Sequence, residues 1–404
     1  MNVAELKDAI FSILLEVQGL HPVSGPHRLG PSGQDEIPEA IARTNEFVEQ
    51  LINEAYQNGF IEPPAFDLKT TDLFGGAVAQ RVGRATSTTD FAFKADNSPD
   101  LLRQAETLRL LREGQIIPRE FRKHFPRVYS ILPLGPPFAY LMEFFGDGYT
   151  RLSDYLFRGI NPSTIEAVLN PLVGKIFELF GIRHEVLLPD PKAIYIDRVV
   201  DRLRRAATLN PKFRAIATSA RIAINSAEYS SYGSYLDAII PKISSFQPPF
   251  SSFVHGDPHP GNIFFKGEGG GIEIRLIDPK PWIWGDYMFD VWKLLHYTMV
   301  TGPREDSDSV DLRISENDTP PKVQYEIHRS GRAQAAVEII RSRLQEFSSA
   351  HGDASYQRRL DLSLASNLLG LTENRLNREP PLEDAAILYY CAGLRYLKQA
   401  AEGL

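Results

Sequence analysis

A short segment rich in proline, PHPG, separates Asp257 from Asn262 in the second half of the chain. Proline lacks a backbone N–H and glycine favours turns, so this piece of chain cannot form a regular helix. We therefore expect a loop here. A loop can bring the side chains of Asp257 and Asn262 to one point.

The sequence predicts an apolar hairpin directly after this loop. Residues 263–265 are Ile-Phe-Phe, the sequence KGEGGG is typical of a turn, and a second apolar run ends at Asp278. The two open ends of a hairpin lie side by side, so Asp278 should return beside Asn262 although they are far apart in sequence. The sequence thus predicts one site that contains Asp257, Asn262 and Asp278.

These three side chains are of the types that phosphoryl transfer requires. A carboxylate can orient a hydroxyl group, and amide and carboxylate oxygens can hold Mg²⁺ against the phosphates of a nucleotide. On this hypothesis Asp257 orients the hydroxyl group, while Asn262 and Asp278 bind Mg²⁺. Each residue alone is more often explained by turn chemistry than by a site, and only the ordered set favours a site.

A zinc site is the alternative interpretation of the loop, because His255, Asp257 and His259 alternate as candidate ligands. Two prolines bend the segment, however, and no other His or Cys lies nearby in the sequence. Mg²⁺ prefers oxygen ligands to imidazole, so the oxygen-rich set favours magnesium.

The motif HGDPHPGN, followed by IDP, resembles the catalytic loop and the metal-binding aspartate of the aminoglycoside phosphotransferase and choline kinase family. The resemblance implies an α+β, protein-kinase-like fold with Asp257 as catalytic base and with Asn262 and Asp278 as Mg²⁺ ligands. It further implies that Asp290, in GDYMFD, lies on a buried helix and braces the loop. His255 would be a supporting residue.

A kinase-like fold also needs an upstream lobe with a phosphate-covering turn, a lysine on a strand and an acid on a helix. Gly75 and Gly76 lie between apolar residues, and glycines let backbone N–H groups approach phosphate oxygens. Lys94 lies in the strand pattern FAFKA, on the face opposite the two Phe residues. Glu106 lies on the flank of a helix predicted over residues 99–113, and we expect it to pair with Lys94.

Two more apolar strand patterns flank a turn rich in Pro and Gly within residues 125–148. They look like the last strands of the upstream lobe and the hinge between lobes. We expect four hinge residues to contact the adenine ring: Met142, Glu143, Phe144 and Phe145.

The composition limits which classes of protein this chain can belong to. The chain has 404 residues, 43% of them hydrophobic, which is enough for a sizeable core in two or three domains or lobes. A formal net charge of −7 argues against nucleic acid as a partner, and no apolar run is long enough to span a membrane. Without a basic leader, and with Cys391 as the single cysteine, a cytoplasmic protein is expected.

The predicted organisation is an N-terminal helical extension over residues 1–66, a nucleotide-binding N-lobe over 67–146 and a helical C-lobe over 147–404 that carries the catalytic loop. The predicted reaction transfers the γ-phosphoryl group of ATP or GTP to a hydroxyl group of a small molecule, such as a sugar, aminosugar or aminoglycoside-like compound. An acidic stretch over residues 303–318 would either attract a polycationic acceptor or be a solvated loop.

Two alternatives are a nucleotide-binding pseudokinase and a protein kinase. The sequence lacks recognisable DFG and APE signatures, which argues against a protein kinase. Neither the acceptor nor the oligomeric state is indicated by the sequence.

Overall fold

The computed structural model describes residues 71–72, 81–85, 91–96, 98–132, 138–146, 148–185, 188 and 190–404. The chain divides into two compact units. The first runs to Tyr149 and includes the separate segment Arg275–Pro281, and the second consists of Thr150–Ile274 and Trp282–Leu404. The predicted extension over residues 1–66 lies outside the described residues. The segment Arg275–Pro281 was expected in the C-lobe, but the structure places it in the first unit.

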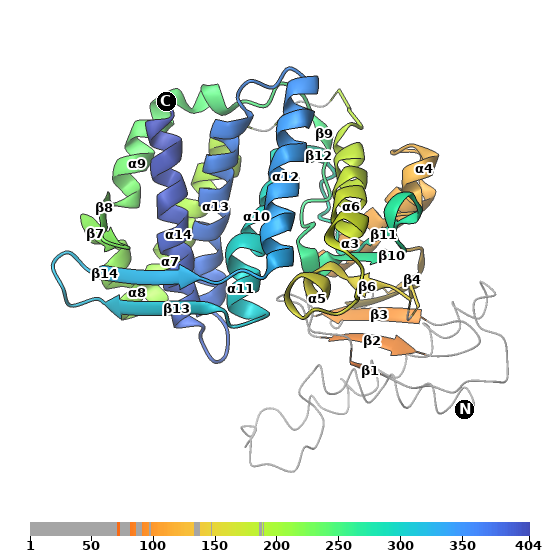
Figure 1. The fold of residues 1–404 in the computed structure, drawn as a ribbon, viewed down its shortest axis with the longest axis horizontal. Coiled ribbons are helices and arrows are strands. Elements are labelled where there is room, and N and C mark those ends of the chain that lie inside the picture. Colours follow the sequence, from red (N-terminus) through yellow and green to blue (C-terminus); the bar gives the residue numbers. More distant parts are fainter. Residues whose placement is uncertain are drawn as a thin grey trace, which may run out of the picture. The chain divides into compact units, whose positions relative to one another are not determined.

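The first unit is built on a five-stranded antiparallel sheet in the order β1-β2-β3-β5-β4. Figure 1 labels the strands β1, β2, β3 and β4 of this sheet. The strands are β1 (Thr71–Asp72), β2 (Arg81–Ala85), β3 (Phe91–Asp96), β4 (Val128–Leu132) and β5 (Phe138–Glu143). Two helices connect β3 to β4, namely α3 (Asp100–Glu113) and α4 (Arg119–Arg122).

Helix α3 forms where the periodicity predicts it. Pro99 precedes its first residue, where a missing backbone N–H is tolerated, and Gly114 follows its last. The buried side chains include Leu101, Ala105, Leu108 and Leu111, spaced by three or four positions so that they share one face. This face packs against β4 and β5.

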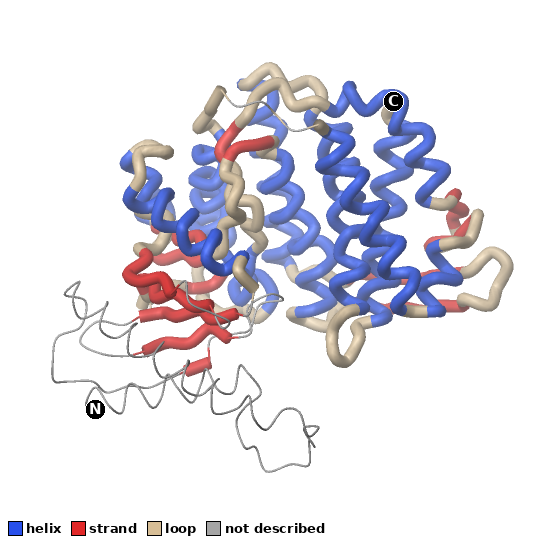
Figure 2. The backbone as a smooth tube through the Cα atoms, turned by 180° about the vertical axis from the view of Figure 1, so that it is seen from behind, coloured by secondary structure: helices blue, strands red, loops and turns tan. Residues whose placement is uncertain are grey.

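The second unit is mainly helical. Its long helices are α6 (Ile165–Phe180), α7 (Arg198–Leu209), α12 (Gly331–Ala350), α13 (Tyr356–Leu376) and α14 (Glu383–Glu402). Helix α13 packs against α14, α7 and α10, and α12 packs against α6. Figure 2 shows these long helices side by side. The shorter helices are α5 (Leu152–Phe157), α8 (Pro211–Ala217), α9 (Tyr232–Ile239), α10 (Met288–His296) and α11 (Gly302–Glu305).

Irregular turns supplement these helices. Two have π-helical geometry, η1 (Ala193–Asp197) before α7 and η5 (Tyr297–Thr301) after α10. Three are of 3₁₀ type: η2 (Ile240–Phe246), η3 (Pro260–Asn262) and η4 (Gly269–Gly271). Because η5 continues α10 without a break, α10 and η5 form one helical rod.

Small sheets complete the second unit. One has the order β13-β14-β7-β8, formed by β13 (Val310–Ser315), β14 (Lys322–Ile327), β7 (Arg221–Ile224) and β8 (Ala227–Ser230). A second pairs β12 (Trp284–Gly285) with β9 (Ser252–Phe253). The third has the order β11-β10-β6 and contains the predicted hairpin, with β11 (Glu273–Leu276), β10 (Ile263–Lys266) and β6 (Thr150–Arg151). The last two residues of β11 belong to the first unit, which begins again at Arg275.

The predicted α+β class is confirmed: a small unit carries the five-stranded sheet, and a larger unit is mainly helical. Within the residues that the structure describes, no helix is both long enough and apolar enough to cross a membrane.

Candidate active site

Lys94 and Asp278 meet in the first unit although they are 184 positions apart in the sequence (278 − 94). Lys94 lies on β3, the middle strand of the sheet, and is buried. Its Nζ lies 2.8 Å from Asp278 Oδ1 and donates a hydrogen bond of 2.7 Å to Gln104 Oε1. Asp278 has a left-handed backbone (φ 61°), a conformation that aspartate tolerates better than most residues. The first unit therefore holds a buried cation beside a carboxylate.

The expected ion pair between Lys94 and Glu106 is not formed. Glu106 is exposed and lies 3.4 Å from Arg109, one turn along the same helix. Gln104 takes the expected place, because positions 104 and 106 point to opposite sides of a helix with 3.6 residues per turn. The spacing of Leu101 and Leu108 on the buried face already placed Gln104 at that face.

Tyr140 is a further residue of this region that the sequence analysis did not identify. It lies on β5 directly opposite Lys94 in the strand register, and it is fully buried. Its hydroxyl group has no hydrogen-bond partner among the described residues. Burial, together with the negative charge of Asp278, raises the pKa of Tyr140 well above its usual value. The phenol is thus a buried, protonated group near Asp278.

The predicted adenine contacts lie at the end of β5. Met142 is buried within the strand, and Phe144 and Phe145 follow it and are half-buried. The backbone N–H of Glu143 donates to the carbonyl group of Arg127 (2.8 Å), so it is already used within the unit. The other hinge contacts remain a prediction. Gly75 and Gly76 lie outside the described residues.

In the second unit, the segment between β9 and β10 is attached to helix α10. The backbone N–H groups of His255 and Gly256 donate to the two carboxylate oxygens of Asp290, at 2.6 and 2.8 Å. Gly256 has a positive φ of 83°, which favours glycine at this position. Asp290 is buried on α10, so its carboxylate fixes the backbone immediately before Asp257.

The environment of Asp290 changes its acidity. Burial raises its pKa to about 7, although the two backbone hydrogen bonds from the loop act in the opposite direction. The charge of Asp257 raises the pKa further, and that of Lys293 lowers it. Asp290 therefore titrates near neutral pH in the folded protein.

Asp257 forms an ion pair with a residue that the sequence analysis missed. Lys293 Nζ lies 2.8 Å from Asp257 Oδ1, and both side chains are largely buried. Lys293 follows Asp290 by three positions on α10, so the two side chains lie on the same helix face. This spacing was visible in the sequence, and it explains how one helix holds both the loop backbone and the Asp257 carboxylate.

Asn262 is oriented by the loop itself. Its side-chain Nδ2 donates to the carbonyl oxygen of Asp257 (2.9 Å), so the amide oxygen is the side-chain atom that could accept a cation. The carboxylate of Asp278, in the first unit, is the other predicted metal ligand. Both are oxygen donors, which suits Mg²⁺.

The histidines of the loop have structural contacts. His255 Nδ1 accepts a hydrogen bond from the Asp257 N–H (3.3 Å), and His259 Nδ1 accepts one from the Gly261 N–H (3.1 Å). The His259 ring also stacks on Tyr297, with centroids 5.0 Å apart. These contacts favour a supporting role for both imidazoles over zinc binding.

A buried ionic network anchors the start of α10. Arg359, on α13, forms ion pairs with Asp286 and Asp353, and all three side chains are buried. The Tyr195 hydroxyl donates to Asp286 Oδ2 (2.6 Å). Asp286 also accepts from the N–H of Met288, the first residue of α10. The network thereby fixes the helix that carries Asp290 and Lys293.

Residues 192–324 match the model of the phosphotransferase enzyme family. This region includes the loop with Asp257 and Asn262, the hairpin that ends at Asp278, and helix α10. The match confirms the resemblance found in the sequence.

Solved structures with similarity to this chain include two classes of small-molecule kinase. A thermostable mutant of aminoglycoside phosphotransferase APH(4)-Ia, in ternary complex with AMP-PNP and hygromycin B, is 12% identical, with a TM-score of 0.48 and coverage of 88% of this chain and 97% of that chain. A Plasmodium vivax ethanolamine kinase is 12% identical, with a TM-score of 0.45 and coverage of 93% and 95%. Choline kinase from Cryptosporidium parvum Iowa II is 12% identical, with a TM-score of 0.42 and coverage of 88% and 93%. Among curated proteins, none matches the sequence significantly.

Proposed function

We propose that this protein is a Mg²⁺-dependent phosphotransferase that moves the γ-phosphoryl group of ATP or GTP to a hydroxyl group of a small molecule. The main observation is the double attachment of the catalytic loop to α10. Asp290 binds the backbone before Asp257, and Lys293 binds the Asp257 carboxylate itself. Positioning supplies much of the rate enhancement in phosphoryl transfer, and this arrangement supports positioning of one carboxylate.

In this proposal Asp257 orients the hydroxyl group of the acceptor and takes its proton as the new O–P bond forms, while the bond between the γ-phosphorus and the leaving nucleoside diphosphate breaks. Lys94 offers positive charge to the phosphates of the nucleotide. Asn262 and Asp278 are the residues that would hold Mg²⁺, which supplies further positive charge to phosphate oxygens when bound. Gln104, which accepts a hydrogen bond from Lys94, positions that lysine within the first unit.

The charges near Asp257 favour a neutral acceptor, such as a sugar, over a polycation such as an aminoglycoside. Lys293 already places a positive charge 2.8 Å from Asp257. Four acidic side chains of the 303–318 stretch also have hydrogen-bond or ion-pair partners within the second unit. Their partners are Arg375 for Glu305 (2.7 Å), Tyr297 for Asp306 (2.8 Å), Arg304 for Asp308, and His328 for Asp311 (2.9 Å).

An acceptor panel tests the proposed function. The full chain is incubated with Mg²⁺ and either ATP or GTP, together with neutral sugars, aminosugars, aminoglycosides or a protein mixture. Products are identified by ³¹P NMR and mass spectrometry. We expect a phosphate ester on a small-molecule hydroxyl group. Nucleotide binding without transfer to any acceptor would instead indicate a pseudokinase, and transfer confined to proteins would indicate a protein kinase.

A further inference from the structure

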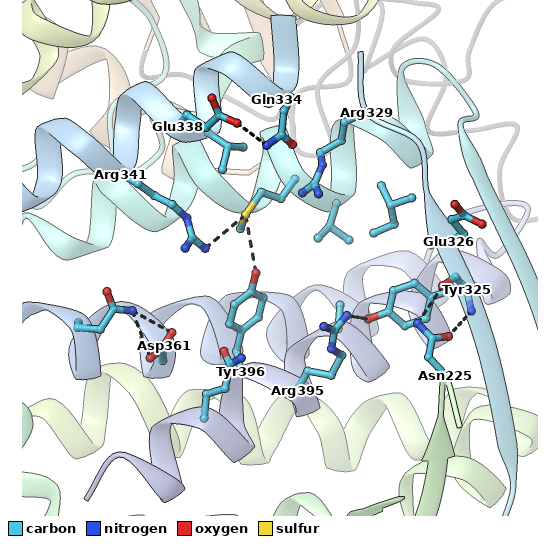
Figure 3. Close-up of a pocket in the computed structure, with 17 residues that line it drawn as sticks. Asn225, Tyr325, Glu326, Arg329, Gln334, Glu338, Arg341, Asp361, Arg395 and Tyr396 are labelled. Atoms are coloured by element: carbon cyan, nitrogen blue, oxygen red, sulfur yellow. Dashed lines mark hydrogen bonds between the residues drawn. The ribbon is translucent and has the colours of Figure 1, made fainter. Parts of the chain in front are cut away.

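The second unit contains a cavity that the proposed phosphotransfer site does not use. It has a volume of about 790 Å³ and lies among β14, η5 and the helices α12, α13 and α14 (Figure 3). This volume is within the range typical of small-molecule sites. Asp257, Asn262, Asp290 and Lys293 do not line it. We call it the arginine cavity, for the three residues Arg329, Arg341 and Arg395 that line it.

Part of the lining of the arginine cavity is apolar. Met299 and Val300 come from η5, and Val337 comes from α12. The Tyr396 hydroxyl, from α14, donates to the sulfur of Met299 (3.7 Å), as Figure 3 shows. These groups provide a surface on which the apolar body of a ligand can be buried.

The three arginines reach the cavity from two sides. Arg341 lies on α12, Arg329 lies just before that helix, and Arg395 lies on α14 (Figure 3). None of them forms an ion pair with a carboxylate in the described part of the chain. Arg395 donates to the Tyr325 hydroxyl (3.1 Å), and Arg341 donates to the Met299 sulfur (4.0 Å). Asp361 interacts electrostatically with Arg341, but no carboxylate of the described residues lies within ion-pair distance of the three guanidinium groups.

Three carboxylates also line the cavity, but each already has a partner on its own side. The pairs are Gln334 with Glu338 (2.7 Å), Gln357 with Asp361 (3.4 Å) and His328 with Glu326 (3.9 Å), and His328 also lies closer to Asp311 (2.9 Å). None of these partners is an arginine of the cavity. The three guanidinium groups thus lack a close ion pair, whereas each carboxylate has a neighbouring partner, and this difference favours an anionic ligand over a cationic one.

We propose that the arginine cavity binds an organic anion, a phosphate or carboxylate attached to an apolar or aromatic body. Guanidinium groups match the planar geometry of such anions and form strong, charge-assisted hydrogen bonds with them. The apolar lining, including Met299 and Val337, would cover the body of the ligand. This inference is independent of the proposed phosphotransfer, because the two sites share no residue.

A matched pair of probes tests whether the arginine cavity binds a negatively or a positively charged ligand. Binding of 1-naphthyl phosphate and of 1-naphthylmethylamine to the full chain is measured by isothermal titration calorimetry, without nucleotide or Mg²⁺. The two probes share one aromatic ring system and differ in charge. We expect the phosphate to bind about tenfold or more tightly than the amine, and its affinity to fall as salt is added.

Arginine variants test whether 1-naphthyl phosphate binds in the arginine cavity. The double variant Arg341→Met and Arg395→Met should weaken binding of 1-naphthyl phosphate by about tenfold or more, because both charges are lost. Arg343→Met is the matched control, since Arg343 lies on the same helix, is paired with Glu346 (3.0 Å) and does not line the arginine cavity. We expect this control to bind like the unmodified protein.

The proposal is overturned if the amine binds as tightly as the phosphate, if the double variant binds like the unmodified protein, or if no probe binds at millimolar concentration. Thermal unfolding of each variant checks that the fold is retained. Because the assay contains no nucleotide and measures no turnover, its result is separate from that of the acceptor panel.

Discussion

Lys293 on α10 lies 2.8 Å from Asp257 in the loop between β9 and β10, and it follows Asp290 by three positions on the same helix. One face of α10 thus supplies both the group that binds the loop backbone and the group that binds the carboxylate. The geometry makes Lys293 a positioning residue for Asp257.

Replacing Lys293 with Met should reduce turnover by about 10²-fold, because the Asp257 carboxylate loses the contact that orients it. Nucleotide affinity should change little, so the effect should appear mainly in kcat. Steady-state kinetics measures both. The control is Lys192→Met, which removes an exposed lysine paired with Asp197. Equal turnover of Lys293→Met and the control would show that the ion pair does not matter for transfer.

The Asp290 carboxylate should make stability depend on pH. Its pKa is about 7 in the folded protein, above its ordinary value of 3.8. Between these values the folded state binds more protons than the unfolded state, so the free energy of unfolding contributed by Asp290 falls as pH rises.

Asp290→Asn removes this titration, although it also loses one acceptor for the loop N–H groups. Chemical denaturation of both proteins at pH 5 and pH 8 measures the effect. Relative to the Asn variant, the unmodified protein should lose stability between the two pH values. An equal change in the free energy of unfolding of both proteins between pH 5 and pH 8 would argue against a raised pKa at Asp290.

Gln104, rather than Glu106, should support Lys94. Gln104→Ala removes the 2.7 Å hydrogen bond to the lysine, and we expect a several-fold higher KM for the nucleotide. Glu106→Ala removes only an exposed contact with Arg109, so its kinetics should match those of the unmodified protein. A higher KM for Glu106→Ala, with an unchanged KM for Gln104→Ala, would instead support the pair of Lys94 and Glu106 expected from the sequence.

Arg359→Met should destabilise the second unit by about 3–5 kcal/mol, because it leaves the buried carboxylates of Asp286 and Asp353 without their cation. The neighbouring Arg358, which is half-buried and has no ion pair in the described residues, gives the matched control Arg358→Met. Urea denaturation compares the two variants. A similar midpoint for both would show that the network contributes little to stability.

The local parts of this architecture could be predicted from the sequence. The loop before Asn262, the hairpin that returns at Asp278 and the strand that carries Lys94 all depend on short-range signals, namely prolines, glycines and alternating apolar residues. The same is true of helix α3, whose observed start at Asp100 lies within one residue of the predicted start.

Contacts between distant elements could not be predicted in this way. The pairing of Arg359 with Asp286 joins residues 73 positions apart (359 − 286), and nothing in either local sequence specifies the other. The arginine cavity likewise depends on the packing of α12 against its neighbours. The contacts of Lys293 and Gln104 could be predicted in part. The helix spacing indicates on which face of its helix each residue lies, but it does not indicate which residue it contacts.

The most direct test of the proposed function is a comparison of the unmodified protein with Asp257→Asn, which keeps the shape of the side chain but removes its basic carboxylate. Transfer of the γ-phosphoryl group to an acceptor identified in the panel is followed by ³¹P NMR, and nucleotide affinity is measured by calorimetry. We expect transfer to fall by about 10²–10⁴-fold, with nucleotide affinity nearly unchanged. Transfer by Asp257→Asn at the rate of the unmodified protein would contradict the assignment of Asp257 as the catalytic base.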